Sequence, residues 1–537
     1  MLLYFTYFAP ESCRALFLLI LSADFSTIAA DMRKLITILS ICFLLTPLSG
    51  RCSEAKITVY PAPESEKMAD SSYEVSVNGH KLDIYKALSP KFRGGEYYFC
   101  YFDFEGEVRV DVKSKFPFTK QLPYTATPEA KAAADKIYLG EIFPDVFRGV
   151  EKQKYKMSFT ADKPFKAIVI RNERRMPLVI FGNAPEKDAP KPDAENVLYF
   201  GAGVHYVGEL VLKSNQTMYV AGGAVVKGVV SAKNAENISV LGRGIISADN
   251  RARHTGCNLK FTNVKNIKIE GIITKDPTNW TVVFHNCKNV VLDDVKICAG
   301  RMINDDAIDI CNTSGVKITN TFARAEDDII AVKGMYGSGV NLGLNRNPYI
   351  MHRDNNLPCE NISIDNCILW SDSANVFRIG YECYAPYFKN IKCTNIYVPF
   401  YSDAPSKFTE YWVRAVVLLQ PTEGMPITNV SFENMTVRSS GGDVHVIFAQ
   451  PRIVMDGDVR TKGAKGEFGR IENCEFKNVK VVGKKGAFKG AIFVDGQDEA
   501  HKVKNFTVEN ADYFGTPITR ESPNVHISKW TESVIVK

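Results

Sequence analysis

Residues 266–269 read Asn-Ile-Lys-Ile, and variants of this phrase recur from residue 237 onward. Most variants alternate apolar and polar side chains with a period of two, which is typical of a β-strand, and each opens with Asn or Gly, which favour turns. The other copies begin at Asn237, Asn289, Gly315, Asn361, Asn390, Asn429, Asn473 and Asn505, at intervals of 23 to 46 residues. No helical pattern separates them. The repeat therefore predicts an all-β fold, with a parallel β-helix over residues 196–537 in which each coil buries its apolar face against its neighbours.

Residues 56–195 lack this repeat, although several of their segments also alternate as strands. These segments are Lys56-Ile-Thr-Val-Tyr, Tyr73-Glu-Val-Ser-Val, Glu107-Val-Arg-Val-Asp-Val and Phe165-Lys-Ala-Ile-Val-Ile. Because turns rich in Pro, Gly and Asn separate them, we expect a small antiparallel β-sandwich domain before the β-helix. The Pro-rich stretch 184–192 is typical of a linker.

The N-terminal 55 residues have the layout of a secretory signal that follows an extra segment. A basic start at Met32-Arg-Lys precedes an apolar run from Leu35 to Leu45, and Ser53-Glu-Ala offers a cleavage site. The apolar run is too short to span a bilayer. We interpret residues 1–31 as the product of an upstream start codon, with a membrane-proximal N-terminus as the alternative. The signal predicts a secreted or periplasmic protein, and Cys52, in a sequence similar to a lipoprotein signal, leaves outer-membrane association open.

The charge composition argues against a nucleic-acid partner, and the spacing of the cysteines favours free thiols. The chain has 537 residues with 66 Lys plus Arg against 60 Asp plus Glu, and it contains no basic run that would indicate nucleic-acid binding. The cysteines beyond the signal lack metal-type spacing and recur in strand-like segments, so we expect buried thiols in place of a disulfide framework. We expect no cofactor and no metal, and the sequence does not determine the oligomeric state.

Two acidic pairs stand at equivalent places in consecutive repeats. Asp305-Asp306-Ala-Ile-Asp-Ile is followed 22 residues later by Asp327-Asp328-Ile-Ile-Ala-Val. Neighbouring strands lie about 4.7–4.9 Å apart, and like charges directly opposite each other are destabilising, so a purely structural repeat has no reason to stack four carboxylates. The apolar residues after each pair should face inward, and in an uninterrupted strand Asp306 and Asp328 would face inward with them. The aspartates must therefore lie at a bend before the strand.

Hydrolysis of a glycosidic bond fits such a cluster. It needs one carboxylic acid to protonate the leaving oxygen and one carboxylate to activate water or to attack. Crowding supplies both, because mutual repulsion raises the pKa of one group while another stays ionised. We therefore assign catalysis to Asp306, Asp327 and Asp328. A Ca²⁺ site and a solvated turn without function are the alternatives.

The motif around the first pair resembles a known family. Asn304-Asp-Asp-Ala-Ile-Asp309 is similar to the Asn-Thr-Asp-Gly-x-Asp signature of polygalacturonase-type (family 28) glycoside hydrolases, and Glu326-Asp-Asp is similar to their Gln-Asp-Asp. The resemblance implies a right-handed parallel β-helix and an inverting hydrolase. It also implies that Asp327 or Asp328 is the general acid and that Asp306 and the remaining aspartate activate water.

The sequence also departs from that family. Its Gly-His-Gly has no match, since Asn375 stands in the place of the histidine, and its Arg-x-Lys has only Trp412-Val-Arg414 as the nearest stretch. The Asn-Asp-Asp motif also resembles dextranase-type (family 49) enzymes, which similarly place a β-sandwich before the β-helix. A neutral sugar is therefore slightly favoured, although Lys333, Arg378 and Arg414 leave room for an acidic one.

Further side chains are predicted to bind a carbohydrate substrate. Beside Asn304, Asp305, Asn375 and Arg414, the candidates are Lys333, Arg378, Glu382 and the sugar-stacking tryptophans Trp280, Trp370 and Trp412. The long loop 334–358, which carries His352 and Arg353, should form a wall of the cleft. Two other functions remain open: a polysaccharide lyase, which would need Ca²⁺ and a base, and a carbohydrate-binding β-helix without catalysis.

Overall fold

The computed structural model describes residues 55–68, 71–90, 95–120, 126–171, 176–335, 357–401, 413–453, 467–486 and 489–537. The predicted signal and Cys52 lie outside these ranges. The regular structure in them is almost entirely β, with one short helix, α4 (Pro128–Ala134), which Thr127 caps. No helix in the described ranges is both long and apolar enough to cross a bilayer.

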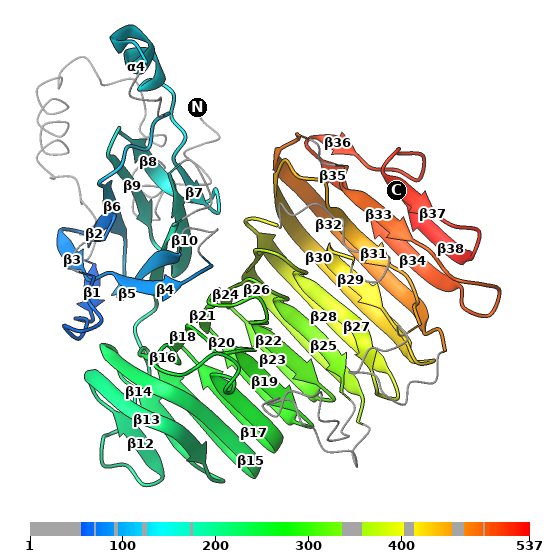
Figure 1. Ribbon diagram of the computed structural model, residues 1–537, viewed down its shortest axis with the longest axis horizontal. Helices are drawn as coiled ribbons and strands as arrows, with labels where there is room; N and C mark the ends of the chain where they lie inside the picture. Colours follow the sequence, from blue (N-terminus) through cyan, green and yellow to red (C-terminus); the bar gives the residue numbers. More distant parts are fainter. Residues whose placement is uncertain are drawn as a thin grey trace, which may run out of the picture. The chain divides into compact units, whose positions relative to one another are not determined.

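The second part of the chain is a parallel β-helix, as the repeat predicts. Strands from β12 (Val197–Phe200) to β38 (Thr531–Val536) form one continuous sheet, which Figure 1 shows as a stack of coils from green to red. Its pairings are parallel apart from the hairpin of β35 (Asp512–Tyr513) and β36 (Thr516–Pro517). The repeated phrases open on, or lie within, β15 (Ala224–Gly242), β17 (Leu259–Glu270), β20 (Lys288–Asp293), β23 (Ser314–Thr319), β26 (Cys359–Ser371), β28 (Phe388–Val398), β30 (Pro426–Ser440), β32 (Arg470–Lys484) and β34 (Val503–Glu509).

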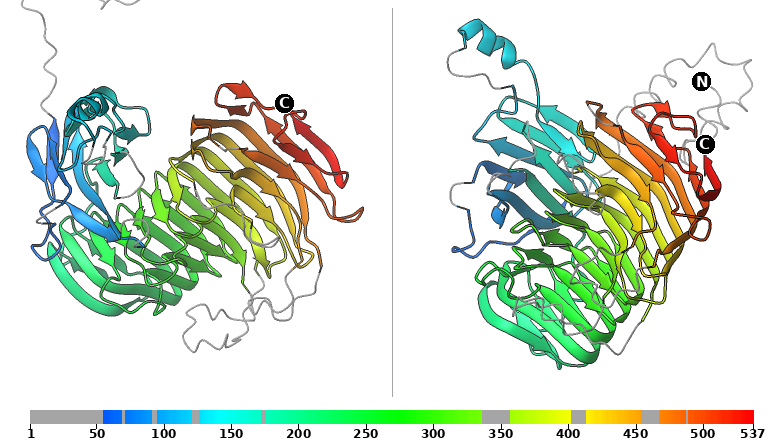
Figure 2. Two further views of the ribbon diagram at one scale, coloured as in Figure 1. Left: turned by 45° about the horizontal axis from the view of Figure 1, so that its top comes forward. Right: turned by 45° about the vertical axis from the view of Figure 1, so that its right-hand side comes forward.

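The second residue of each phrase stacks on the next copy and builds the core. One inward column is formed by Ile238, Ile267, Val290, Val316, Ile362, Ile391, Val430, Cys474 and Phe506. All of them are nearly or fully buried. The two views in Figure 2 follow the same coils from other sides. Since each coil covers its apolar side chains only with its neighbours, the stack stabilises itself coil by coil.

The asparagines that open the phrases have two roles. Asn266 and Asn390 have φ angles of 58° and 57°, in the left-handed region that Asn tolerates better than most residues. The side-chain amide of Asn266 donates to Oδ1 of Asn237 in the preceding coil at 2.8 Å, and Asn390 donates in the same way to Asn361 at 3.0 Å. The turn residue is therefore also a rung of an amide ladder along the β-helix.

One side of the β-helix carries both acidic pairs. It contains β19 (Val282–His285), β22 (Ile308–Cys311), β25 (Ile330–Gly334), β27 (Phe377–Cys383) and β29 (Ala415–Gln420). Ile308 pairs with Ile330 and Ile310 with Val332, which confirms the predicted 22-residue register. Both acidic pairs lie outside the strands, in the irregular backbone just before β22 and β25, as the inward parity of these four residues requires.

Residues 56–183 form two further sheets. The first contains β1 (Lys56–Val59), β4 (Tyr85–Leu88), β5 (Glu96–Glu105), β7 (Glu141–Phe143), β10 (Phe165–Ile170) and β11 (Leu178–Asn183), and the second contains β2 (Tyr73–Val77), β3 (His80–Leu82), β6 (Val108–Ser114), β8 (Arg148–Lys152) and β9 (Lys156–Ala161). All four segments expected to be strands are strands. The pairing differs from a purely antiparallel one, because β11 joins β5 in parallel after the chain has passed through the second sheet.

The first of these sheets packs on the side of the β-helix that contains β16 (Ile245–Ser247), β18 (Ile273–Lys275), β21 (Lys296–Cys298) and β24 (Phe322–Ala325). The buried residues at this contact include Tyr85, Tyr97, Phe99, Tyr101, Phe143 and Phe181 from the sheet and Val225, Ile245, Ile273, Cys298, Phe322 and Trp370 from the β-helix. Residues 56–537 therefore form one compact unit.

The described cysteines are unpaired thiols. All ten are buried, and several stand in the inward columns, as Cys474 does. This confirms that they fill the core as small apolar side chains.

Candidate active site

Asp305 joins the two acidic turns through their backbones. Its Oδ1 accepts hydrogen bonds from the N–H groups of Glu326 at 2.8 Å and Asp327 at 3.3 Å, while its Oδ2 accepts one from Gly300 at 2.5 Å. The residue is 0% exposed, and burial raises the pKa of its carboxyl to about 7. Both oxygens of Asp305, expected at the substrate, are occupied by the backbone.

Asp306 shares a lysine with a second carboxylate. Nζ of Lys333 lies 2.6 Å from Oδ2 of Asp306 and 2.7 Å from Oδ1 of Asp309, and all three side chains are buried. Burial raises the pKa of both carboxyls, with Lys333 opposing the rise. The other oxygen of Asp306, Oδ1, is buried and has no hydrogen-bond partner in the part of the chain that the structure describes, so a bound water molecule or hydroxyl group would satisfy it.

Asp309 is the site residue that the sequence reasoning left out. It lies in β22 between Ile308 and Ile310, both of which face inward. Since side chains alternate along a strand, the same parity argument that placed the isoleucines inside would have placed Asp309 on the outer side with the cluster.

Trp280 supports Lys333 from the other side. The ammonium nitrogen lies 3.8 Å from the centroid of the indole ring, and Trp280 is only 5% exposed. Such a contact between a cation and an aromatic face stabilises a desolvated charge. The sequence predicted that this ring stacks on a sugar; in the structure Lys333 lies against it.

Asn375 links Asp328 to the next coil. Its backbone N–H and its side-chain amide both donate to Oδ1 of Asp328, at 3.0 and 2.7 Å, and its own Oδ1 accepts from the N–H of Ala415 at 2.9 Å. Arg414, the residue before Ala415, is partly exposed. The amide at position 375 therefore holds a catalytic candidate in place, in the position where the family signature has a histidine.

Arg378 lies between two carboxylates. Its Nη1 is 3.6 Å from Oδ2 of Asp328, and its Nε is 3.8 Å from Oε2 of Glu382. Arg378 and Glu382 are 7% and 6% exposed, so this is a buried pair and not an ordinary surface ion pair. Both residues thus lie beside the aspartates, as predicted.

Asp327 is the most open member of the cluster. It is partly exposed, its Oδ2 accepts from the side-chain amide of Asn304 at 3.3 Å, and its Oδ1 accepts from the N–H of Asp328 at 3.0 Å. Burial raises the pKa of Asp327 well above its ordinary value, and the charges of Asp306 and Asp328 raise it further. A carboxyl whose pKa is raised keeps its proton to a higher pH, which suits the role of general acid.

The remaining candidates for substrate binding are either fully buried or outside the described residues. Trp370 is 0% exposed, so the expectation that it stacks on a sugar is wrong. Trp412, His352, Arg353 and most of the loop 334–358 lie outside the described residues.

The Ca²⁺ alternative is disfavoured by Lys333. Its ammonium group occupies the space between Asp306 and Asp309 where a divalent cation would bind. Among the described residues, no group of three or more His, Cys, Asp and Glu is arranged to hold a metal ion.

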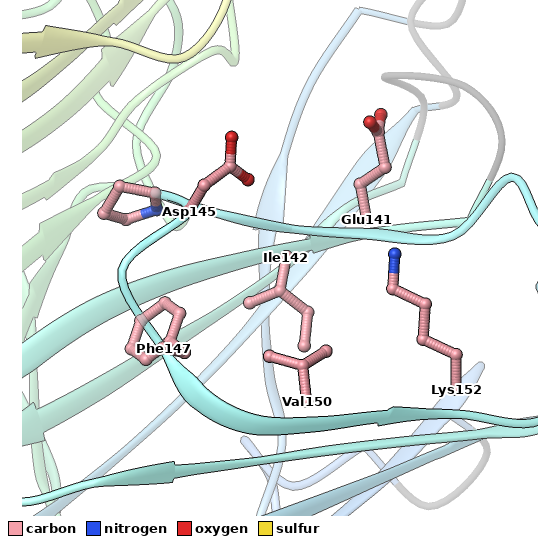
Figure 3. A pocket seen from close by; sticks show the side chains of 7 residues that line it. Glu141, Ile142, Asp145, Phe147, Val150 and Lys152 are labelled. Carbon is pink, nitrogen blue, oxygen red and sulfur yellow. The ribbon is translucent and has the colours of Figure 1, made fainter.

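A separate cavity of about 360 Å³ lies between β7 and β8 (Figure 3). It is lined by Glu141, Ile142, Pro144, Asp145, Phe147, Val150 and Lys152. Glu141 accepts a hydrogen bond from Nη2 of Arg438 at 2.6 Å. None of the clustered aspartates lines this cavity, so it is not part of the candidate site.

Two curated proteins that are similar to this chain are polygalacturonases, in agreement with the family that its acidic motif resembles. Polygalacturonase from Medicago sativa is 26% identical over 221 residues, which cover 37% of this chain and 50% of that protein. An exopolygalacturonase from Arabidopsis thaliana is 23% identical over 228 residues, 34% of this chain and 50% of that protein. The chain therefore spans about half the length of the curated relatives it matches.

The fold also has a solved counterpart. Dex49A from Penicillium minioluteum superposes with a TM-score of 0.61 at 12% identity, over 89% of this chain and 96% of that one. At this identity the likeness concerns the fold.

The family model for glycosyl hydrolases family 28 matches residues 213–451, a stretch that contains both acidic pairs and Asn375. The candidate site thus lies within a part of the chain that resembles glycosyl hydrolases family 28.

Proposed function

We propose that the chain is a glycoside hydrolase that cleaves the glycosidic bonds of a polysaccharide or oligosaccharide with its clustered aspartates. The observation that carries this proposal is the crowding of Asp306, Asp327 and Asp328 in two adjacent bends, inside the stretch that resembles family 28. The charges of Asp306 and Asp328 raise the pKa of Asp327. Such crowding separates an acid from a base.

In the proposed reaction, Asp327 donates its proton to the leaving glycosidic oxygen as the bond from the anomeric carbon breaks. Asp306 and Asp328 accept a proton from water, whose oxygen forms the new bond to that carbon. Two N–H groups of Asn375 and the guanidinium of Arg378 stabilise a charged carboxylate at Asp328. The free Oδ1 of Asp306 supports a contact with the water.

The charge of the described site favours a neutral sugar. The cations beside the aspartates are Lys333, which is paired with Asp306 and Asp309, and Arg378, which lies between Asp328 and Glu382. With these charges already balanced by carboxylates, the cluster would repel a uronate group. The two curated relatives are polygalacturonases, but a neutral substrate is proposed for this chain on the charges of its own site.

The test is release of reducing ends from a panel of plant, microbial and host glycans. Wild-type protein should act on at least one of them, and Asp327→Asn should not. Binding of a glycan without turnover would instead favour a non-catalytic carbohydrate-binding β-helix.

The polysaccharide-lyase alternative needs a base that abstracts a proton. Lys333 does not suit that role, because Asp306 and Asp309 outweigh its burial and raise its pKa well above the ordinary value. A lyase would form an unsaturated sugar, detected by its ultraviolet absorbance, and would lose activity with a chelator. We expect neither.

For the chain as a whole, we infer a right-handed β-helix over residues 196–537 and a β-sandwich built from the two sheets of residues 56–195. Ring contacts between Phe159 and Phe165, at 5.5 Å, and between Tyr73 and Tyr98, at 5.9 Å, join the two sheets and support a sandwich. Removal of the first 55 or so residues during export would place the enzyme outside the cytoplasm. N-terminal sequencing of exported protein tests this: a mature chain that starts at Met1 would contradict it.

A further inference from the structure

The first N-terminal sheet touches the turn that carries the aspartates. Tyr97, on β5, is fully buried, and its phenol oxygen donates a hydrogen bond to the carbonyl of Ala299 at 2.9 Å. The next residue, Gly300, gives its N–H to Asp305 at 2.5 Å. Two adjacent residues of one turn therefore contact the N-terminal sheet and the acidic cluster.

Leu88, on the neighbouring strand β4, adds to this contact. Its N–H donates to Oδ1 of Asp276 at 2.6 Å. Gly300 has a φ of +128°, and a Cβ built on it would meet the carbonyl oxygen of Leu88 at 3.3 Å. The turn thus requires glycine, and the N-terminal sheet lies directly against it.

Arg324 holds the same turn from within the β-helix. Its carbonyl accepts from the N–H of Ala299 at 2.9 Å. Its guanidinium lies 4.2 Å from the ring centroid of Tyr97 and 4.1 Å from that of Trp370. Asp372 completes the arrangement by accepting from Nε of Arg324 and from Nε1 of Trp370, both at 2.9 Å.

Two residues after Arg324, the second acidic turn begins. The N–H groups of Glu326 and Asp327 donate to Asp305, so the two turns are connected through that carboxylate. Contacts from Tyr97 and Arg324 therefore reach both turns through a short chain of hydrogen bonds, which is buried except at Asp327. The hydrogen bonds from Tyr97, Gly300, Glu326 and Asp327 are 2.5 to 3.3 Å long, and hydrogen bonds inside a protein of low dielectric stiffen the structure around them.

We propose that Tyr97 and Arg324 are positioning residues of the aspartate cluster, so that the N-terminal sheets are an integral part of the hydrolytic site. The kinetic part of this inference rests on the proposed hydrolase function. Small errors of placement are costly, because a displacement of about 1 Å at a catalytic group can lower the rate about 10²-fold.

Tyr97→Phe and Tyr101→Phe form a matched pair of variants. Both tyrosines lie on β5 with the same parity and are buried, and both contact the backbone of the β-helix. The oxygen of Tyr101 accepts from the N–H of Gly223 at 3.0 Å, in a coil far from the cluster. Each substitution keeps the ring and removes a hydroxyl that is hydrogen-bonded to the backbone of the β-helix, so the two should destabilise the protein to a similar extent.

The first measurement is amide hydrogen exchange, which needs no substrate. Tyr97→Phe should accelerate exchange in peptides that contain Gly300, Glu326 and Asp327, and Tyr101→Phe should leave these peptides as in the wild type. Unchanged exchange in Tyr97→Phe would overturn the inference. Arg324→Lys, which keeps the charge but loses the planar guanidinium, should show the same pattern.

The second measurement is kinetics on a glycan that the wild type hydrolyses. Tyr97→Phe should lower kcat at least about tenfold with KM nearly unchanged, because a displaced acid or base affects the transition state, and Tyr101→Phe should retain wild-type kcat. Faster exchange with unchanged kcat would overturn the positioning role. If the wild type hydrolyses no glycan, the proposed function fails, and hydrogen exchange alone decides whether Tyr97 orders the turns.

Discussion

Nζ of Lys333 lies 2.6 Å from Oδ2 of Asp306, and both residues are shielded from solvent. A buried ion pair is stable only when further contacts offset the desolvation of its charges. Asp309, at 2.7 Å from the same nitrogen, and the ring of Trp280, at 3.8 Å, provide them. Lys333 is thus the residue that allows carboxylates to be buried together on this side of the β-helix.

Lys333→Met should destabilise the protein strongly at neutral pH. It leaves the charges of Asp306 and Asp309 without their partner, and breaking a buried pair typically costs about 3–5 kcal/mol. The loss should shrink at pH 5, where both carboxyls take up protons more readily. Denaturant unfolding at the two pH values measures the difference. Lys317→Met, at an exposed position of β23, is the control, and an equal effect of both variants would contradict this role.

Asp306→Asn, Asp327→Asn and Asp328→Asn should each reduce turnover by about 10²–10⁴-fold, which is the usual contribution of a positioned acid or base. Combined variants should lose little more than single ones, because residues that act as a unit are not additive. Asp327→Asn should keep or increase stability, since repulsion from Asp306 and Asp328 is relieved. The control is the exposed Asp193→Asn. Near-normal turnover in both Asp327→Asn and Asp328→Asn would remove these residues from the mechanism.

The parts of the fold that depend on local periodicity could be predicted from the sequence. The alternation around Ile308 and Ile330 fixed the register of the acidic coils and placed both pairs in bends. The different binding partners of the carboxylates could not be predicted. Nothing in the sequence distinguishes Asp305, which binds backbone amides, from Asp306, which binds Lys333. The contact of Tyr97 with Ala299 joins residues about 200 positions apart and follows from tertiary packing alone.

Asp305→Asn should change how stability depends on pH. Burial raises the pKa of Asp305 to about 7, while an unfolded Asp titrates near about 3.9. The folded state therefore binds the extra proton, and the stability linked to it is complete below about pH 4 and disappears as pH rises through about 7, by at most about 1.4 kcal/mol per unit.

The variant lacks this titration. Its free energy of unfolding, relative to the wild type, should thus improve steadily from pH 4 to pH 8. At pH 4 the variant should be the less stable protein, because an amide cannot accept from Gly300, Glu326 and Asp327 together. Urea unfolding across this range measures both effects, and parallel pH profiles would contradict the assignment.

Polygalacturonate should be a poor substrate compared with neutral glycans. Asn375 holds Asp328 where the family signature has a histidine, and Lys333 and Arg378 are already paired with carboxylates. Initial rates on polygalacturonate and on neutral polysaccharides of similar length provide the comparison, with low salt as the condition that exposes charge repulsion most clearly. Efficient cleavage of polygalacturonate would show that other basic residues, such as Arg414, bind the uronate.

Hydrolysis should invert the anomeric configuration. An inverting enzyme needs room for a water molecule between its acid and its base, with the two carboxyl groups about 6.5–9.5 Å apart. Asp327 lies in the second turn and Asp306 in the first, and the buried Oδ1 of Asp306 has no protein partner in the described structure, so a bound water could satisfy it. A retaining enzyme would instead need a carboxylate about 5–5.5 Å from the acid, free to attack the sugar. Asp328, which neighbours Asp327 in sequence, is already held by Asn375 and Arg378.

Proton NMR of the product, recorded before mutarotation, should therefore show the anomer opposite to that of the substrate bond. Clean retention would exclude the water-activating role of Asp306 and assign a covalent intermediate to one of the aspartates.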